Sequence, residues 1–283
     1  MADAPARTDA RTFSEKTPAF RAVEALVAPA IAASVKLDQR GTENLPAEGP
    51  FVLSPNHYSN FDPVVVAWAV WKLKRAPRFL AKASLFSVPV VGALLRAIGQ
   101  IPVERARPGR GNASISAATA LIEDRKGVIV YPEGTLTRDP GLWPMRGKTG
   151  AVRLALEHGI PLIPSAHWGV QAIMPRYSKK LRLFGRKPVK VAYGPPVDLD
   201  DLRGHPLDQK TLAEATDRLM AAITGLLEEL RGETAPAERW NPKAHNQSEF
   251  GRLGDGRARS AGPAGDSSAG SAADSSADSG ARE

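Results

Sequence analysis

The residues best suited to chemistry lie in the segment Ser54-Pro55-Asn56-His57-Tyr58-Ser59-Asn60-Phe61-Asp62-Pro63. His57 and Asp62 are five residues apart, so on a continuous helix of about 3.6 residues per turn they would point about 140° apart, and only a bent loop brings them together. In such a loop the carboxylate would fix the tautomer of the imidazole, which makes His57 a general base near neutral pH. The alternative interpretation is a plain helix cap, with Asp62 before Pro63, and a surface histidine.

A second candidate loop is Tyr131-Pro132-Glu133-Gly134-Thr135-Leu136-Thr137-Arg138-Asp139. It follows an apolar strand, and the ends of strands are where open α/β sheets bind ligands. One short segment combines a carboxylate (Glu133), a flexible Gly134, two hydroxyls and the Arg138 guanidinium, although an ordinary glycine turn would have the same outline.

Several classes of chemistry lack support in the composition. The chain has no cysteine, so it has neither a disulfide framework nor a thiolate nucleophile. Its five histidines show no close metal-ligand spacing such as H-E-x-x-H, and no metal or cofactor is predicted. The sequence also lacks the G-x-S-x-G motif of serine hydrolases.

The formal net charge of +8 is unevenly distributed. Residues 71–190 contain 22 Lys and Arg against 6 Asp and Glu, a net of +16, and the remainder carries −8. Such a local field attracts phosphate in nucleic acid, in anionic lipid or in a small substrate. Aromatic residues make up only 6% of the chain, which argues against a nucleic-acid stacking platform.

Strand-like and helix-like segments alternate along the chain and predict one α/β domain, with a central mostly parallel or mixed sheet flanked by helices. The expected helices span 20–35, 63–72, 90–98, 112–124, 149–158 and 207–231. The expected strands span 51–53, 78–81, 101–103, 127–131, 161–165 and 189–193. We expect residues 1–18 to be flexible, residues 19–240 to form the domain, and the Gly-, Ala-, Ser- and Asp-rich residues 246–283 to be a disordered tail.

Four motifs occur in an informative order: Asn-His-x4-Asp at 56–62, Val-Glu-Arg at 103–105, Pro-Glu-Gly-Thr at 132–135 and Ile-Pro-Leu-Ile-Pro at 160–164. In order and spacing they resemble the motifs of the glycerolipid acyltransferases of the 1-acylglycerol-3-phosphate type. The resemblance covers about residues 35–200, and four ordered motifs are far more specific than any one alone.

The resemblance implies a role for each matching residue. His57 would take the proton from the acceptor hydroxyl as it attacks an acyl thioester, and Asp62 would orient His57, with no acyl-enzyme. Arg105 would bind the acceptor phosphate, and Glu133, Gly134 and Thr135 would hold the acceptor. The fourth motif, 160–164, would shape the pocket.

The sequence departs from the family pattern at one position. Many relatives have an arginine after Glu-Gly-Thr, where this chain has Leu136, and Arg138 follows two residues later. Arg138 is therefore the candidate replacement for phosphate binding. Lys82, where relatives often carry a lysine, and Lys148 are further phosphate candidates, with a solvated lysine as the alternative interpretation of each.

The implied function is transfer of a fatty acyl group from acyl-CoA or acyl carrier protein to 1-acyl-glycerol-3-phosphate, giving phosphatidic acid. Glycerol-3-phosphate and other lysophospholipids remain alternative acceptors, and a non-catalytic lipid- or nucleic-acid-binding protein is the contrasting hypothesis. Intact His57 and Asp62 argue for the enzyme.

Several features predict a peripheral protein at the cytoplasmic face of the cell membrane. The first residues lack the basic-then-apolar order of a signal peptide, and no transmembrane helix is expected. The basic and apolar segment 179–187 suits an anionic membrane surface, or is a solvated loop, and the helix at 20–35 suits the membrane interface. The uncharged run 83–95 could line an acyl groove or fill the core.

Overall fold

The computed structural model describes residues 18–103 and 111–248. Its elements are α1 (Pro18–Ser34), β1 (Val35–Arg40), η1 (Thr42–Asn44), β2 (Phe51–Pro55), α2 (Asp62–Lys72), β3 (Leu80–Lys82), η2 (Ala83–Leu85), α3 (Val91–Ala97), β4 (Ile101–Val103), α4 (Gly111–Glu123), β5 (Gly127–Ile129), α5 (Gly150–His158), β6 (Leu162–Trp168), η3 (Val170–Ala172), β7 (Lys187–Tyr193), η4 (Asp200–Leu202), α6 (Gln209–Arg231) and η5 (Pro242–His245).

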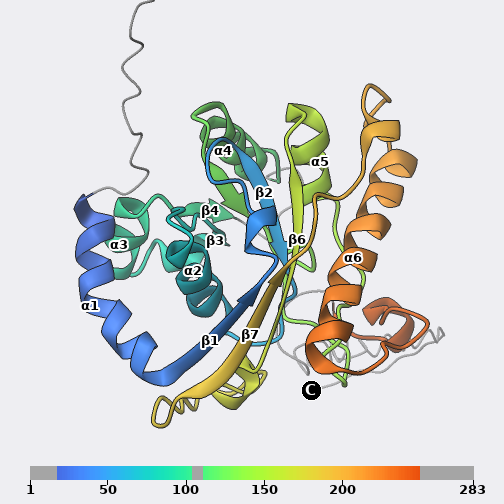
Figure 1. Ribbon diagram of the computed structural model, residues 1–283. Helices are drawn as coiled ribbons and strands as arrows, with labels where there is room; N and C mark the ends of the chain where they lie inside the picture. The colour runs from blue at the N-terminus through green and yellow to red at the C-terminus, as the bar shows by residue number, and fades with distance from the viewer. Residues whose placement is uncertain (1–17, 104–110, 249–283) are drawn as a thin grey trace, which may run out of the picture.

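A mixed five-stranded sheet forms the centre of the molecule, in the order β1-β7-β6-β2-β5 (Figure 1). β2 is parallel to both β5 and β6, whereas β6 and β7 are antiparallel. A second, parallel pair, β3 and β4, joins this sheet beside β5 through the bridge between Phe79 and Ile129. The predicted α/β class with a mixed sheet and flanking helices is confirmed.

Alternating side chains of the strands pack on two helical layers, which lie on opposite sides of the sheet in Figure 1. On β2, Phe51 and Leu53 pack with residues of α2, whereas Val52 packs with residues of α4, α5 and α6. On β6, Ile163 belongs to the α2 side and Leu162 to the α6 side. The period of two along each strand therefore decides which side chains reach the α2 side.

The carboxyl ends of β2 and β6 are neighbours, because the two strands are parallel and paired from Val52 with Leu162 to Pro55 with Ser165. The loop after β2 leads into α2, and β6 ends at Trp168. Side chains from these two strand ends can therefore meet on the α2 side of the sheet.

The described residues include no helix that is long and apolar enough to cross a membrane. The predictions for residues 1–17 and for 249–283 of the tail lie outside the described residues. Strand β1 and the short 3₁₀ helices were not expected from the sequence.

Candidate active site

The loop between β2 and α2 places His57 and Asp62 in contact. Nδ1 of His57 lies 3.0 Å from Oδ2 of Asp62. The same oxygen accepts hydrogen bonds of 2.7 Å from the N–H groups of Tyr58 and Ser59, which turn the loop back on itself. The structure thus has the bent loop that the spacing required for a catalytic pair.

The helix-cap interpretation of Asp62 is wrong in detail. α2 begins at Asp62 itself, Phe61 is the capping residue, and no side chain caps the helix. The carboxylate of Asp62 is wholly buried and is used by the preceding loop and by His57. His57 is only 8% exposed, so the surface-histidine alternative is excluded too.

Asp62 also contacts a second histidine that sequence reasoning missed. Nε2 of His167, on β6, lies 3.0 Å from Oδ1 of Asp62, and both side chains are wholly buried. Asn56 fixes the backbone of His167, because its amide donates to the carbonyl of His167 and accepts from the N–H. The available signal was a histidine at the end of an apolar run that follows the fourth motif.

The environment of Asp62 favours its charged form. Burial raises the pKa of a carboxyl group, but the charge of His167 and the contacts with His167 and His57 outweigh this effect and lower the pKa of Asp62 to about 2. Asp62 is therefore ionised at neutral pH and can stabilise an imidazolium at His57.

Glu133 supports the loop from the inside, and its expected part in holding the acceptor stays a prediction. Its two carboxyl oxygens accept hydrogen bonds from the N–H of His57 (3.0 Å) and from that of Met145 (3.1 Å). Its side chain is wholly buried. Burial raises the pKa of Glu133 to about 8, although the N–H donors of Met145 and His57 oppose the shift.

Gly134 and Thr135 follow Glu133 in the same loop. Gly134 has a φ of +70°, and a Cβ there would lie 3.2 Å from Cδ of Lys148, so the lysine stem packs directly against the glycine. Thr135 is half-buried. Neither residue lines the cavity that contains His57, and their expected contact with the acceptor stays a prediction.

Arg138 is buried against Tyr177, and its expected role as a phosphate ligand stays a prediction. It is 2% exposed, donates a 3.0 Å hydrogen bond from Nη1 to the hydroxyl of Tyr177, and lies over the Tyr177 ring. It does not line the cavity that contains His57. The structure thus gives no support to the idea that Arg138 replaces the arginine missing at Leu136.

Two predicted phosphate ligands belong to the small parallel pair. Lys82 ends β3, but its side chain is not among those described. β4 ends at Val103, two residues before Arg105, and Arg105 lies outside the described residues. The roles of both residues therefore stay predictions.

His57 lies at the wall of an apolar cavity of about 550 Å³. The Tyr131 ring stacks on the His57 ring, with 4.1 Å between their centroids, and also lines this cavity. The remaining wall comes mainly from α1, α2, η2 and α3, with lining residues that include Val23, Val27, Val64, Trp68, Phe79, Leu85 and Leu95. Of residues 83–95, Leu85 and Leu95 thus help to line a cavity, whereas Phe86 is buried.

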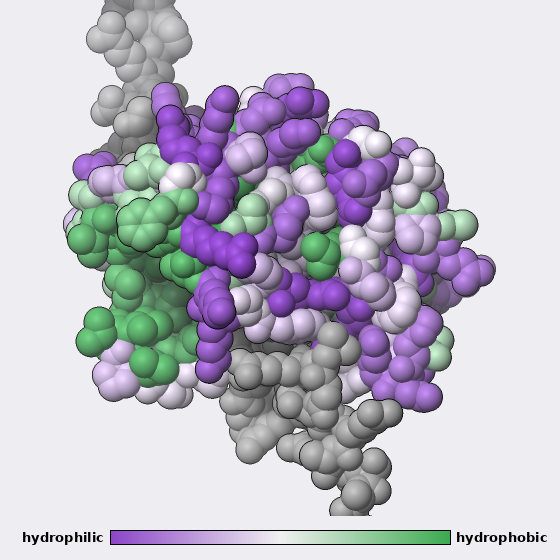
Figure 2. Space-filling model, turned by 90° about the horizontal axis from the view of Figure 1, so that it is seen from below, coloured by the Kyte–Doolittle hydropathy of each residue, from purple (hydrophilic) through white to green (hydrophobic). Residues whose placement is uncertain are grey.

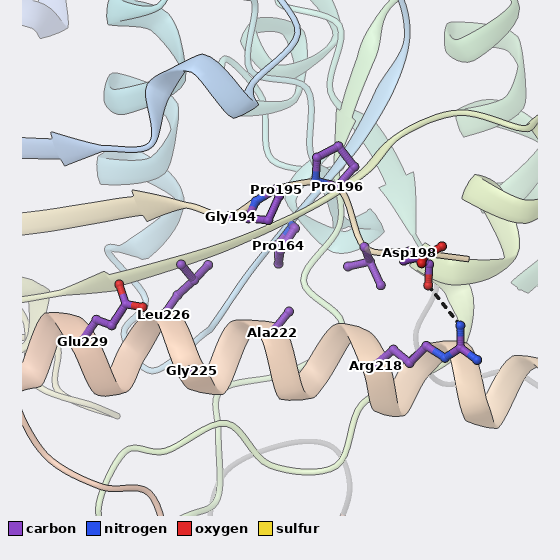
Figure 3. Close-up of a pocket in the computed structure, with 11 residues that line it drawn as sticks. Pro164, Gly194, Pro195, Pro196, Asp198, Arg218, Ala222, Gly225, Leu226 and Glu229 are labelled. Carbon is purple, nitrogen blue, oxygen red and sulfur yellow. Dashed lines mark hydrogen bonds between the residues drawn. The ribbon is translucent and has the colours of Figure 1, made fainter. Parts of the chain in front are cut away.

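The fourth motif does not shape this cavity, contrary to expectation. Ile160 and Leu162 pack with the helices on the α6 side. Pro164 lines a different cavity of about 460 Å³, between the end of β7 and α6, where Arg218 approaches Asp198 (Figure 3). The motif instead builds strand β6, which carries His167.

The arrangement combines a buried, oriented imidazole with a cavity suited to a hydrocarbon chain. With Nδ1 facing Asp62, Nε2 is the nitrogen that can accept a proton. No cluster of side chains suited to a metal ion occurs in the described part of the chain, and metal-independence stays a prediction.

The chain is similar to known acyltransferases. A family model described as Acyltransferase matches residues 36–168. A 1-acyl-sn-glycerol-3-phosphate acyltransferase of Bacillus subtilis is 31% identical over 184 residues, which are 65% of this chain and 84% of the relative. A chloroplastic 1-acyl-sn-glycerol-3-phosphate acyltransferase of Brassica napus is 30% identical over 58% of this chain, and the matched region spans only 47% of that relative.

The fold itself resembles a solved structure. The crystal structure of the 1-acyl-sn-glycerophosphate (LPA) acyltransferase from Thermotoga maritima aligns with a TM-score of 0.55. It is 22% identical, and the alignment covers 76% of this chain and 81% of that chain.

Proposed function

This chain belongs to the glycerolipid acyltransferase family, and we propose that it transfers a fatty acyl group from an acyl thioester to the free hydroxyl of 1-acyl-glycerol-3-phosphate, giving phosphatidic acid. The observation that carries the proposal is the position of His57, which is oriented by Asp62 and lies at the wall of a large apolar cavity. The names of the relatives support the choice of acceptor.

The proposed reaction is a direct transfer. The acceptor oxygen attacks the thioester carbonyl carbon while its proton passes to Nε2 of His57, and Asp62 stabilises the resulting imidazolium. The C–S bond then breaks, the acyl group stays on the acceptor oxygen, and the thiolate leaves with the proton returned from His57. His57 acts as a base in the first step and as an acid in the second.

The cavity beside His57 is the proposed site of the acyl chain. A volume of about 550 Å³ lies within the usual range for small-molecule pockets. Each methylene transferred from water to an apolar wall contributes about 0.8 kcal/mol, so a long chain would be bound strongly by this lining. The assay described below compares CoA with acyl carrier protein as the carrier of the acyl group.

The exposed apolar residues next to the cavity support a membrane surface as partner. Leu26 of α1 is 81% exposed and Val90 beside α3 is 81% exposed, and both lie near elements that line the cavity. Figure 2 shows hydrophobic side chains gathered on the side of the molecule that carries α1 in Figure 1. A lipid chain could pass from such a surface into the cavity without crossing water.

The segment 179–187 adds a charged component to the same proposal. Phe184 is 98% exposed, and Lys179, Lys180, Arg182, Arg186 and Lys187 surround it in sequence. Lys187 pairs with Val35, the residue that follows α1, so this basic segment adjoins the end of the apolar helix. Cations beside exposed apolar groups favour anionic lipid. Localisation of the protein at the cytoplasmic face of the cell membrane stays a prediction.

A single assay tests the function. Purified protein is incubated with acyl-CoA or acyl carrier protein thioesters and, separately, with 1-acyl-glycerol-3-phosphate, glycerol-3-phosphate, other lysophospholipids and monoacylglycerol, and products are identified by mass. We expect phosphatidic acid from 1-acyl-glycerol-3-phosphate as the main product. Absence of an acylated product from every donor and acceptor, with anionic vesicles present, would contradict the proposal.

A further inference from the structure

The carboxylate of Asp62 divides its contacts between two histidines. Oδ2 faces Nδ1 of His57 and accepts the N–H groups of Tyr58 and Ser59, whereas Oδ1 faces only His167 among the described residues. We propose that His167 is a positioning residue for acyl transfer, which acts by holding the second oxygen of Asp62 so that the first stays directed at His57. This inference rests on the proposed function.

The contact favours one tautomer of His167. Nε2 of His167 and Oδ1 of Asp62 are 3.0 Å apart in a wholly buried place, at ion-pair distance, but the two atoms are not aligned for a regular hydrogen bond. An unprotonated nitrogen at this distance would direct its lone pair at the carboxylate and repel it, which favours a hydrogen on Nε2. His167 is therefore the polar neighbour of Oδ1 of Asp62.

The surroundings prevent His167 from turning away. The two hydrogen bonds with Asn56, of 3.2 Å and 2.9 Å, fix its backbone. The ring of Tyr58 stacks against its imidazole with 5.0 Å between centroids, and the Tyr58 hydroxyl accepts from the N–H of Val170. Tyr58 thus joins the His57 loop to the segment that follows β6.

The electrostatics of Asp62 agree with this role. The charge of His167 is the largest of the influences that lower the pKa of Asp62 against the effect of burial. Without His167, Oδ1 would lose its only close polar contact among the described residues and would remain a buried oxygen. Such a carboxylate would either bind a proton or rotate, and in both cases it would stabilise a charged His57 less well.

The test compares three substitutions of His167. A glutamine can place its amide nitrogen near the position of Nε2 and donate to Asp62, whereas the shorter asparagine places its nitrogen near Nδ1 and does not reach. Leucine fills space without a donor. We expect His167→Asn and His167→Leu to lower kcat by about 10- to 100-fold with KM changed less than about threefold, and His167→Gln to recover kcat to within about fivefold.

A purely structural role predicts a different pattern. If His167 only fills the core, the apolar leucine is the best replacement and the two amides are equally poor, which would overturn the proposal. The effect must also act through Asp62: in an Asp62→Asn background, adding His167→Leu should lower kcat by less than about threefold. An additive loss would contradict the inference.

A spectroscopic measurement on the unmodified protein separates this inference from the proposed function. ¹⁵N-labelled histidine resonances should show a hydrogen on Nε2 of His167 and on Nδ1 of His57, whether or not a given acceptor is acylated. A His167 ring protonated only on Nδ1 would overturn the inference even if acyl transfer is confirmed. Conversely, the expected resonances with no acyl transfer would leave the contact intact and contradict the function.

Discussion

Removing the imidazole of His57 is expected to abolish most acyl transfer without unfolding the protein. His57→Ala loses a positioned general base, which lowers rates by about 10²- to 10⁴-fold. His205→Ala, which removes an exposed histidine elsewhere, is the matched control and should keep the activity of the unmodified protein. The measurements are kcat/KM and the circular dichroism spectrum. Near-normal turnover of His57→Ala would end the proposed mechanism.

Arg105 is expected to recognise the acceptor phosphate. A charge-assisted bidentate bond contributes about 1.5–3 kcal/mol, so Arg105→Ala should reduce kcat/KM on 1-acyl-glycerol-3-phosphate by roughly 10- to 150-fold. Arg105→Lys should lie between the two, because lysine keeps the charge but not the planar fork.

Monoacylglycerol, which has the hydroxyl but no phosphate, provides the control substrate for Arg105. The slow rate on this substrate should hardly change in Arg105→Ala. Arg153→Ala, on α5, serves as a control variant and should preserve the preference for phosphate. Equal losses on both acceptors in Arg105→Ala would mean that Arg105 is structural.

The buried support of Glu133 predicts a pH-dependent stability. Its pKa is about 8 in the folded protein, above its ordinary value of 4.5, so the folded state binds the proton more tightly than the unfolded state. The stability due to Glu133 is fully present below about pH 4.5 and is lost as the pH rises through about 8. The effect is on the order of a few kcal/mol.

Glu133→Gln isolates this effect. The variant should be less stable at pH 5, because an amide nitrogen cannot accept the N–H of His57 or Met145, but its stability should no longer decline between pH 5 and 8 on account of residue 133. Denaturant unfolding at several pH values measures the difference. An identical slope in both proteins would contradict the assignment.

At the scale of elements, the basic segment 179–187 is expected to bind anionic membranes. Phe184→Ser removes a side chain that is 98% exposed and should weaken binding to vesicles with anionic lipid by severalfold. It should leave turnover on lysolipid dispersed below its critical concentration nearly unchanged. Vesicle sedimentation gives the affinity, and neutral vesicles are the control. Equal binding of both proteins to both vesicles would contradict a membrane-binding segment.

The sequence predicted the buried elements well and the edge of the sheet poorly. Phe51–Leu53 and Gly127–Ile129 are short and wholly apolar, and runs of this kind have few alternatives in an α/β chain. Strand β1 was missed because Lys36, Asp38 and Arg40 make it resemble a loop. Its charged residues are tolerated since it is an edge strand, paired among the described strands only with β7, which lies about 150 residues later.

In the candidate site, too, contacts between residues close in sequence were easier to predict than contacts between residues far apart in sequence. The His57 to Asp62 pair lies within one loop, so its spacing could suggest the contact. His167 comes from another strand, 105 residues after Asp62, and only the pairing of β2 with β6 brings it near. The burial of Arg138 and its hydrogen bond to Tyr177 could not be predicted for the same reason, because Tyr177 lies 39 residues later.

At the scale of the whole molecule, deletion of residues 246–283 is expected to change little. This segment has almost no apolar residues that could contribute to a core. The thermal midpoint and kcat of the shortened protein should match those of the full chain. A fall of several degrees in the midpoint would show that the composition was misinterpreted.

Helix α1 lines the apolar cavity but is separate from the residues around Asp62. It precedes the sheet in the chain, packs through the edge contact of Phe20 with Trp71, and closes one side of the cavity with Val23, Val27 and Ile31. Among the described residues, the groups that contact Asp62 come from the loop before α2 and from β6, not from this helix. Substitutions in α1 alone can therefore change which acyl-chain lengths the cavity accepts in the course of evolution. The residues proposed to take part in proton transfer, His57 and Asp62, would not have to change.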